Sequence, residues 1–281
     1  MNTIKLKNML MQFFNEDIGD GDLSSETIFG PNEQGKFTFY AKQSGIFCGK
    51  QIIEIGFTLL DPKLQVQVLK QDGEHVKKGD RLAVIEGSLR NLLTGERVIL
   101  NCIQRMSGIA TQAHEAAMLV EGTNAKVCDT RETIPGLRML DKYAVRAGGG
   151  YNHRSGLYDA IMLKDNHIAF AGSISEAVRI ARSKIGHTVK IEVEIETKEQ
   201  LLEAIEAGAD IIMFDNRTPD EIRAWLPLVP AHIATEASGG ITLDNLRSYA
   251  ETGIEWISLG ALTHSVQAFD ISALVEPKGE Y

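Results

Sequence analysis

The sequence predicts an α/β protein in two regions, the second of which is a barrel or near-barrel of about six parallel strands. Three observations support this prediction. Beyond residue 125, short apolar runs rich in strand-forming residues alternate with helical runs, a pattern typical of βαβ units. Polar residues or glycines follow each of those apolar runs. The first hundred residues instead carry short alternating segments, which indicate a half-buried sheet.

Length and composition narrow the class of protein. A chain of 281 residues can form two ordinary domains, and 43% hydrophobic with 24% charged residues is typical of globular proteins. The net charge of −9 argues against nucleic-acid binding, and no apolar run is long enough to cross a bilayer. We therefore expect neither nucleic acid nor a membrane as a partner. In so acidic a chain, any anionic ligand needs a local basic cluster.

Cysteine usage indicates a reducing compartment. Cys48, Cys102 and Cys128 are odd in number and widely spaced, and they match neither a zinc nor a redox motif. The N-terminus has the spacing of an amphipathic helix rather than the continuous apolar run of a signal peptide. Both features predict a cytoplasmic protein.

The N-terminal region begins with that helix, followed by a polar loop. The apolar residues of the helix recur at helical spacing: Leu6, Met9, Leu10, Phe13 and Phe14. The acids of the loop at residues 16–25 could bind a metal ion. We interpret the segment instead as a solvated loop that ends in a Ser or Thr helix cap.

Short elements and one long helical region complete this part of the chain. The pattern predicts a helix at residues 52–60 and strands at residues 36–41, 45–48, 64–69 and 82–87. Residues 89–119 then show helical spacing, and Gly108 predicts a break in it. We place the boundary there, which gives an N-terminal domain at residues 1–107 and a C-terminal domain at residues 108–281.

The C-terminal region alternates regularly between strands and helices. The predicted strands are residues 125–128, 160–163, 190–195, 211–214, 233–235 and 256–259. The predicted helices between them are residues 175–183, 198–207, 219–226 and 243–250. Gly208 follows one of these helices at the position where a left-handed residue ends it.

Chemistry-bearing residues gather where these strands end. The strand ends carry Asp129-Thr-Arg131, Lys164-Asp-Asn-His167, Glu194-Ile-Glu196, Asp215-Asn216, Glu236-Ala-Ser-Gly-Gly240 and Ser258-Leu259-Gly260. In a parallel barrel these ends surround one opening, which is where active sites form. Six such ends in sequence indicate an active site rather than chance.

The last two strand ends are typical of phosphate sites. Ser238-Gly239-Gly240 and Ser258-Leu259-Gly260 each precede a helix, and free backbone N–H groups at a helix start favour a phosphate. Glycines that only make tight turns are the alternative for either segment alone. The two together favour phosphate, because barrels often bind one after their final strands.

A basic cluster completes the pattern. Residues 126–167 hold seven Lys or Arg against five Asp or Glu, a positive excess in an acidic chain. Arg131, Arg154 and Lys164 stand near His153 and His167 in this segment. Arginine matches the geometry of carboxylates and phosphates, so the cluster predicts a ligand with several negative charges. We interpret residues 143–154, with three consecutive glycines, as a flexible loop that carries His153 and Arg154 to the pocket.

The order of the motifs resembles one family. The motifs are Asp129-Thr-Arg131, Pro135-Gly-Leu-Arg138, Lys142-Tyr-Ala-Val145, Gly148-Gly-Gly-Tyr-Asn-His-Arg154, Lys164-Asp-Asn-His167, Glu192-Val-Glu194, Asp215-Asn216 and Ser238-Gly-Gly240. They resemble the quinolinate phosphoribosyltransferases, also called nicotinate-nucleotide pyrophosphorylases (carboxylating). The likeness covers nearly the whole chain.

The resemblance implies a fold, a reaction and an assembly. The fold is an N-terminal open-faced α/β sandwich followed by a C-terminal α/β barrel of six strands. The reaction transfers phosphoribosyl from phosphoribosyl pyrophosphate to quinolinate with decarboxylation, giving nicotinate mononucleotide, CO₂ and pyrophosphate for NAD biosynthesis. Mg²⁺ is the implied cofactor. A homodimer or larger homo-oligomer is implied, in which Arg97 is donated across the interface.

The resemblance also implies roles for individual residues. Substrate binding falls to Arg97, Thr130, Arg131, Glu132, His153, Arg154, Lys164, Glu194 and Asp215. Of these, Lys164, Glu194 and Asp215 are the implied catalytic residues, with Glu194 and Asp215 near the magnesium–pyrophosphate. The 5′-phosphate falls to Ser238, Gly239, Gly240, Ser258, Leu259 and Gly260.

One residue departs from the family pattern. Glu132 stands where the family usually has a lysine of the anion pocket. Losing one partner of a desolvated charge pair costs about 2–5 kcal/mol, and a reversed charge costs at least as much. The departure leaves three alternatives open. Glu132 points away from the ligand, or the protein is a weakly active or non-catalytic ligand-binding homologue, or it is a transferase for a pyridine with a single carboxylate, such as nicotinate.

Overall fold

The computed structural model describes residues 1–275, which form two compact units. The first unit holds Met1–Gln112, Met139–Gly148 and residues 266–275. The second holds Ala113–Arg138 and Gly149–Ser265. Within the described residues, no helix combines the length and the apolar character that crossing a membrane requires.

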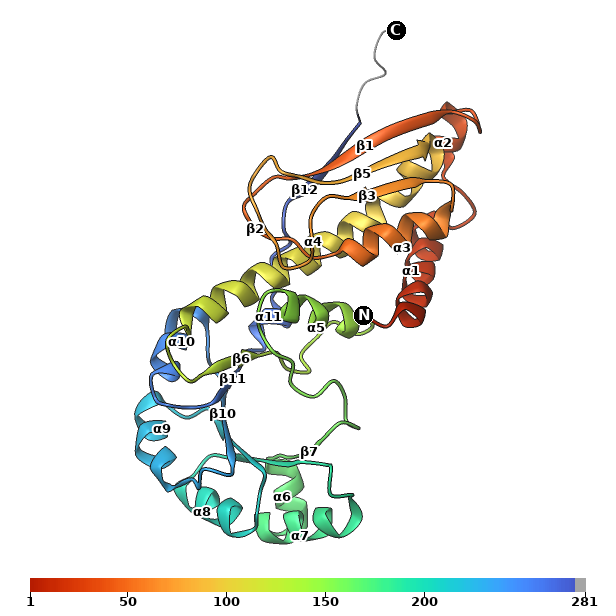
Figure 1. Ribbon diagram of the computed structural model, residues 1–281. Helices are drawn as coiled ribbons and strands as arrows, with labels where there is room; N and C mark the ends of the chain where they lie inside the picture. The colour runs from red at the N-terminus through yellow and green to blue at the C-terminus, as the bar shows by residue number, and fades with distance from the viewer. Residues whose placement is uncertain (276–281) are drawn as a thin grey trace. The chain divides into compact units, whose positions relative to one another are not determined.

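An antiparallel sheet forms the centre of the first unit (Figure 1). Its strands, in spatial order, are β12 (Ile271–Val275), β1 (Gln34–Ala41), β5 (Arg81–Ser88) and β3 (Gln65–Val68). A separate pair joins β2 (Gly45–Ile46) to β4 (His75–Val76). The helices are α1 (Thr3–Ile18), α2 (Leu23–Ile28), α3 (Lys50–Leu60), α5 (Arg138–Ala147) and most of α4 (Leu89–Leu119).

Aromatic residues join the sheet to α3 in this unit. Phe37 and Phe39 of β1 are buried, and their ring centroids lie 5.7 and 6.2 Å from that of Phe57 in α3. Tilted and edge-on pairs at such distances stabilise a core beyond the area they bury. The predicted open-faced sandwich is therefore present, with the helix α3 against one face of the sheet.

Two local predictions in this unit are wrong. The segment at residues 16–25 does not end in a Ser or Thr cap, because Asp22 caps α2 and accepts a hydrogen bond from the Ser25 N–H at 3.0 Å. Gly108 does not break a helix, since α4 runs unbroken to Leu119. A Cβ at Gly108 would lie 2.1 Å from the carbonyl oxygen of Gln267, so the glycine allows a close backbone approach.

The second unit is built on a sheet of six parallel strands. In spatial order they are β6 (Lys126–Cys128), β11 (Trp256–Ser258), β10 (Ala234–Ser238), β9 (Ile211–Asp215), β8 (Ile191–Ile195) and β7 (Ile161–Leu163). All six predicted strands are thus confirmed. In the described residues β6 and β7 are the two edges and do not pair, so the barrel has one unpaired seam.

Helices follow the strands of this unit, and most of them lie along the outer side of the sheet (Figure 1). They are α6 (Asp165–Ala171), α7 (Ile174–Lys184), α8 (Lys198–Glu206), α9 (Pro219–Trp225), α10 (Leu243–Ala250) and α11 (Ala261–His264), with a 3₁₀ turn at Leu226–Leu228. Side-chain caps define several starts; Thr197, for example, accepts from the Gln200 N–H at 3.2 Å. The four predicted helices are confirmed, and Gly208 ends α8 with a φ of 77°.

The predicted flexible loop at residues 143–154 is partly wrong. Its first residues belong to the helix α5, and only the segment from Gly148 onward is a loop. Two buried polar contacts hold that helix in the first unit. Arg105 binds Asp141 through two hydrogen bonds of 2.8 Å, and the Tyr143 hydroxyl donates to Asp72 at 2.7 Å. The sequence prediction missed these partners because they lie far apart in the chain.

Candidate active site

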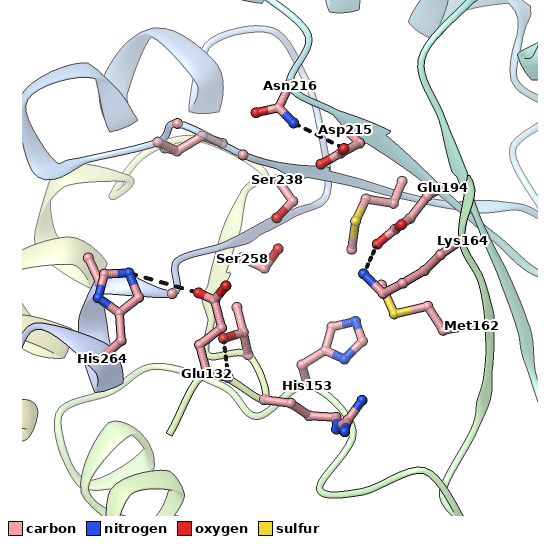
Figure 2. Close-up of a pocket in the computed structure, with 18 of the residues that line it drawn as sticks. Glu132, His153, Met162, Lys164, Glu194, Asp215, Asn216, Ser238, Ser258 and His264 are labelled. Carbon is pink, nitrogen blue, oxygen red and sulfur yellow. Dashed lines mark hydrogen bonds and ion pairs between the residues drawn. The ribbon is translucent and has the colours of Figure 1, made fainter. Parts of the chain in front are cut away.

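One cavity of about 730 Å³ opens at the carboxyl ends of the parallel strands in the second unit (Figure 2). It brings together almost all the site residues predicted for this part of the chain. They are Thr130, Arg131, Glu132, His153, Arg154, Lys164, Glu194, Asp215, Ser238, Gly239, Gly240, Ser258 and Gly260.

Two predicted residues do not line this cavity. Leu259 is 2% exposed, and its N–H donates to the carbonyl of Cys128 at 2.9 Å, so that amide is already used by the sheet. Arg97 lies on α4 in the other unit and is exposed to solvent. The cavity as described is therefore built from the second unit without Arg97.

Two arginines give the cavity unpaired donors. The Nε atoms of Arg131 and Arg154 are buried and have no hydrogen-bond partner among the described residues. Nη1 of Arg154 donates to the carbonyl of Ala160 at 3.1 Å. Burial, and then the charge of Arg131, lower the pKa of Arg154. A buried donor without a partner is costly, so this pair is suited to an anionic ligand.

His153 lies between two buried carboxylates. Its Nε2 is 3.1 Å from Oε2 of Glu192 and 3.5 Å from Oε2 of Glu236. These acids belong to β8 and β10 and are 2% and 4% exposed. Burial lowers the pKa of His153, whereas hydrogen bonds to both carboxylates act in the opposite direction and raise it. Burial raises the pKa of Glu192.

The other ring nitrogen of His153 accepts a hydrogen bond. The backbone N–H of Arg154 donates to Nδ1 at 2.8 Å, which requires a lone pair there. The two carboxylates favour an imidazolium, but an imidazolium carries a proton on both nitrogens and does not fit this contact. The hydrogen bond decides, since two N–H groups would otherwise face each other at 2.8 Å. We therefore assign a neutral ring with its proton on Nε2.

A lysine and two carboxylates face one another on neighbouring strands. Nζ of Lys164 lies 2.5 Å from Oε1 of Glu194, and Oδ2 of Asp215 accepts from the Asn216 side chain at 3.0 Å. Burial raises the pKa of Glu194, and Lys164 opposes that rise. Glu194 and Asp215 end adjacent parallel strands, so their oxygens lie on the same rim of the cavity.

Backbone geometry explains the glycine turn after β10. Gly239 and Gly240 have φ values of 89° and 65°, in the left-handed region that glycine adopts without strain. A Cβ at Gly239 would lie 2.3 Å from Oδ1 of Asn216. The turn therefore needs glycine for both its conformation and its space, and it lines the cavity with the bare backbone that a phosphate site requires.

Glu132 points into the cavity, not away from it (Figure 2). Its Oε2 lies 3.8 Å from Nε2 of His264, and a Cβ at Gly260 would come within 1.8 Å of the same oxygen. The carboxylate thus lies over the second glycine turn. An anionic ligand that approaches this turn meets a negative charge.

Comparison with known proteins decides the family. The family model described as "Quinolinate phosphoribosyl transferase, N-terminal domain" matches residues 22–107, and the model of the corresponding C-terminal domain matches residues 109–273. The chain belongs to the quinolinate phosphoribosyl transferase family.

Individual members of the family are similar over almost their full length. The chain is 58% identical over 272 residues to a Bacillus subtilis protein named "Probable nicotinate-nucleotide pyrophosphorylase [carboxylating]", which covers 97% of this chain and 94% of that protein. Among solved structures, NadC from Streptococcus pyogenes has a TM-score of 0.94 at 38% identity and covers 98% of this chain and 97% of that one. The corresponding Francisella tularensis structure has a TM-score of 0.94 at 35% identity, with 98% of each chain covered.

The sequence prediction gave no role to several residues that line the cavity of this family member. They are Met162, Met213, Asn216, Ile241, Thr242, Ala261 and His264. It also gave no role to Glu192 and Glu236, whose carboxylates lie beside His153. A signal for Glu192 does exist in the sequence: acids at positions 192 and 194 alternate within a run that is otherwise apolar, so both point to the same face of a buried strand.

Proposed function

We propose that this member of the quinolinate phosphoribosyl transferase family transfers phosphoribosyl from phosphoribosyl pyrophosphate to quinolinate. Loss of CO₂ then gives nicotinate mononucleotide, with pyrophosphate as the other product, for NAD biosynthesis. The observation that carries the proposal is the cavity itself: an acidic chain gathers Arg131, Arg154, Lys164 and a bare glycine turn around one barrel mouth. Such a site is suited to two highly negative reactants.

The residues divide between the two reactants. Arg131, Arg154 and Lys164 bind the quinolinate carboxylates and the pyrophosphate, since each carries a positive charge on the cavity wall. Thr130 and the Ser238 and Ser258 turns bind the phosphate on the ribose of phosphoribosyl pyrophosphate. The Leu259 amide takes no part, because it already binds Cys128.

Positioning and electrostatics account for the chemistry. The pyridine nitrogen attacks the anomeric carbon of the ribose as pyrophosphate leaves, so positive charge develops on the sugar. Glu194 and Asp215 stabilise that charge from the cavity rim, and no covalent nucleophile is needed. In the following step the bond to the carboxylate beside the ring nitrogen breaks and CO₂ leaves. The electron pair stays on that ring carbon, where the neighbouring cationic nitrogen stabilises it, and a proton from water then bonds to the carbon to give nicotinate mononucleotide.

Mg²⁺ fits the donors that this rim offers. Glu194 and Asp215 present carboxylate oxygens at the ends of adjacent strands, and oxygen ligands are those that Mg²⁺ prefers. These two residues would hold the ion, which supplies positive charge to the leaving pyrophosphate when bound. Lys164, which pairs with Glu194, would add a further positive charge beside that ion.

A homodimer or larger assembly completes the site in this proposal. Arg97 is exposed on α4 of the first unit and does not line the cavity in the second unit of the same chain. It is therefore available to a neighbouring subunit. Arg97→Ala would raise the KM for quinolinate without loss of the fold. Cys48, Cys102 and Cys128 form no disulfide within the described part of the chain, which accords with the reducing conditions of a cytoplasmic setting.

One assay tests the proposal. Purified protein with quinolinate, phosphoribosyl pyrophosphate and Mg²⁺ should form nicotinate mononucleotide, followed by its ultraviolet absorbance, and release one CO₂ per product. Turnover of nicotinate without CO₂ release would identify a transferase for pyridines with one carboxylate. Binding of both substrates without product would identify a non-catalytic homologue.

A further inference from the structure

The His153 ring connects two buried acids to the backbone of a cavity arginine. Nε2 faces Glu192 and Glu236, while Nδ1 accepts from the Arg154 N–H. We propose that Glu192 and Glu236 are positioning residues that act through a neutral His153 to fix Arg154 for a substrate carboxylate. This role of the two acids rests on the function proposed above.

The segment that carries His153 is also held from its other side. Oδ1 of the fully buried Asp129 accepts from the His153 N–H at 2.9 Å, and Oδ2 accepts from the Asn152 side chain at 2.6 Å. The Tyr151 N–H donates to the carbonyl of Val127 in β6 at 2.9 Å. The backbone is thus fixed to β6, and the ring is fixed to β8 and β10. This arrangement leaves Arg154 little freedom at its Cα.

Arg154 keeps a hydrogen-bond donor that no other group of the described protein uses. Nη1 of Arg154 binds the Ala160 carbonyl, which orients the guanidinium plane. Nε is buried without a partner in the part of the chain that the structure describes. A guanidinium binds a carboxylate through two parallel hydrogen bonds, so a small error in its direction weakens both at once. A buried hydrogen-bond network that holds this side chain in position therefore strengthens carboxylate binding.

A metal ion is the competing occupant of this cluster. His153, Glu192 and Glu236 offer three ligand atoms within 4.8 Å of one another. A metal would need the lone pair of Nε2, but the Arg154 N–H already requires the lone pair of Nδ1, and a neutral ring has only one. The Nε2 proton instead supplies the hydrogen bond that both carboxylates face. The geometry thus favours a proton over a cation at this place.

The ring's protonation can be measured without turnover. In protein labelled with ¹⁵N-histidine, the His153 signal is the one absent from His153→Asn. We expect a neutral ring protonated on Nε2 across about pH 6 to 8, where an ordinary histidine titrates. Protons on both nitrogens, a proton on Nδ1 alone, or a shift of this signal on adding one equivalent of zinc would each overturn the proposal.

Kinetics test the positioning role. Glu192→Ala should raise the KM for quinolinate about tenfold, with kcat changed by less than about twofold, because a misdirected Arg154 weakens ground-state and transition-state binding alike. Glu192→Gln should restore most of the affinity, since its amide oxygen still accepts from Nε2. Glu206→Ala, an exposed acid on α8, is the matched control and should behave as the unmodified protein.

The outcomes separate this proposal from the function on which it rests. If Glu192→Gln loses as much affinity as Glu192→Ala, or if kcat falls while KM stays constant, the positioning role is wrong. If the unmodified protein makes no nicotinate mononucleotide, the proposed function fails, and the histidine spectrum still decides the state of the ring.

Discussion

Two buried arginine environments in this molecule differ in a way that separates stability from function. In the first unit, Arg105 binds both oxygens of the fully buried Asp141 at 2.8 Å. In the second unit, Arg131 and Arg154 keep buried Nε donors without a partner in the described chain. The first arrangement is complete within the protein, whereas the second is incomplete until an anion binds. The predictions below test that contrast.

The largest effect is expected from breaking the complete pair. Asp141→Ala leaves the Arg105 guanidinium without its bidentate partner and should lower the free energy of unfolding by about 3–5 kcal/mol. Urea denaturation followed by circular dichroism measures this change. A loss under about 1 kcal/mol would show that the pair is not a stabilising element.

The incomplete arginine should behave in the opposite way. Arg154→Lys keeps the charge but removes the planar fork, so kcat/KM for quinolinate should fall about a hundredfold, equivalent to about 2.7 kcal/mol. Its free energy of unfolding should change by less than about 1 kcal/mol, because no protein carboxylate is left unpaired. A variant that unfolds as readily as Asp141→Ala would erase the distinction between the two sites.

Glu132 is a negative charge that opposes the anionic ligand of the unpaired arginines. Glu132→Lys replaces a negative charge over the second glycine turn and should raise kcat/KM for quinolinate about tenfold, with an effect that shrinks as salt is added. Glu206→Lys makes the same change of net charge far from the cavity and controls for overall charge. An unchanged or lower kcat/KM would mean that Glu132 does not oppose the ligand.

The smallest effect concerns a carboxylate outside the cavity. Burial raises the pKa of Asp210, but the hydrogen bond from the Ile191 N–H at 2.8 Å and the charge of Arg182 outweigh burial and lower that pKa. Because the pKa of Asp210 in the folded protein lies below its ordinary value of 3.8, this stabilisation is present above pH 3.8 and is lost as the pH falls through the folded pKa. Asp210→Asn should remove about 1 kcal/mol at pH 7 and much less at pH 3, measured by thermal unfolding at both pH values.

The site also shows which residues a sequence can reveal. Lys164, Glu194 and Asp215 follow runs of apolar residues, so their place at strand ends is visible in the pattern itself, and the cavity does contain all three. Glu236 also belongs to a predicted strand end, but no feature of the neighbouring sequence indicates that it faces His153. That contact joins residues more than eighty positions apart, and only the pairing of β10 with its neighbours brings them together.

Misplaced predictions share the same cause. Leu259 stands in a segment typical of a phosphate turn, but the pairing of β11 with β6 places its amide against Cys128. Gly108 has the chemistry of a helix break, yet Gln267, distant in sequence, requires a residue without a side chain there. In both cases a partner far along the chain, invisible to any local window, determined what the residue does.

The sequence by itself determined the alternation of strands and helices, the strand ends that carry charge, and the family, because periodicity and short motifs are local properties of the chain. The tertiary structure decided the direction of Glu132, the two acids behind His153 and the unpaired donors of Arg131 and Arg154. These depend on which groups meet across the barrel. Hydrogen bonds and burial act over a few ångströms in space, whatever the separation along the chain.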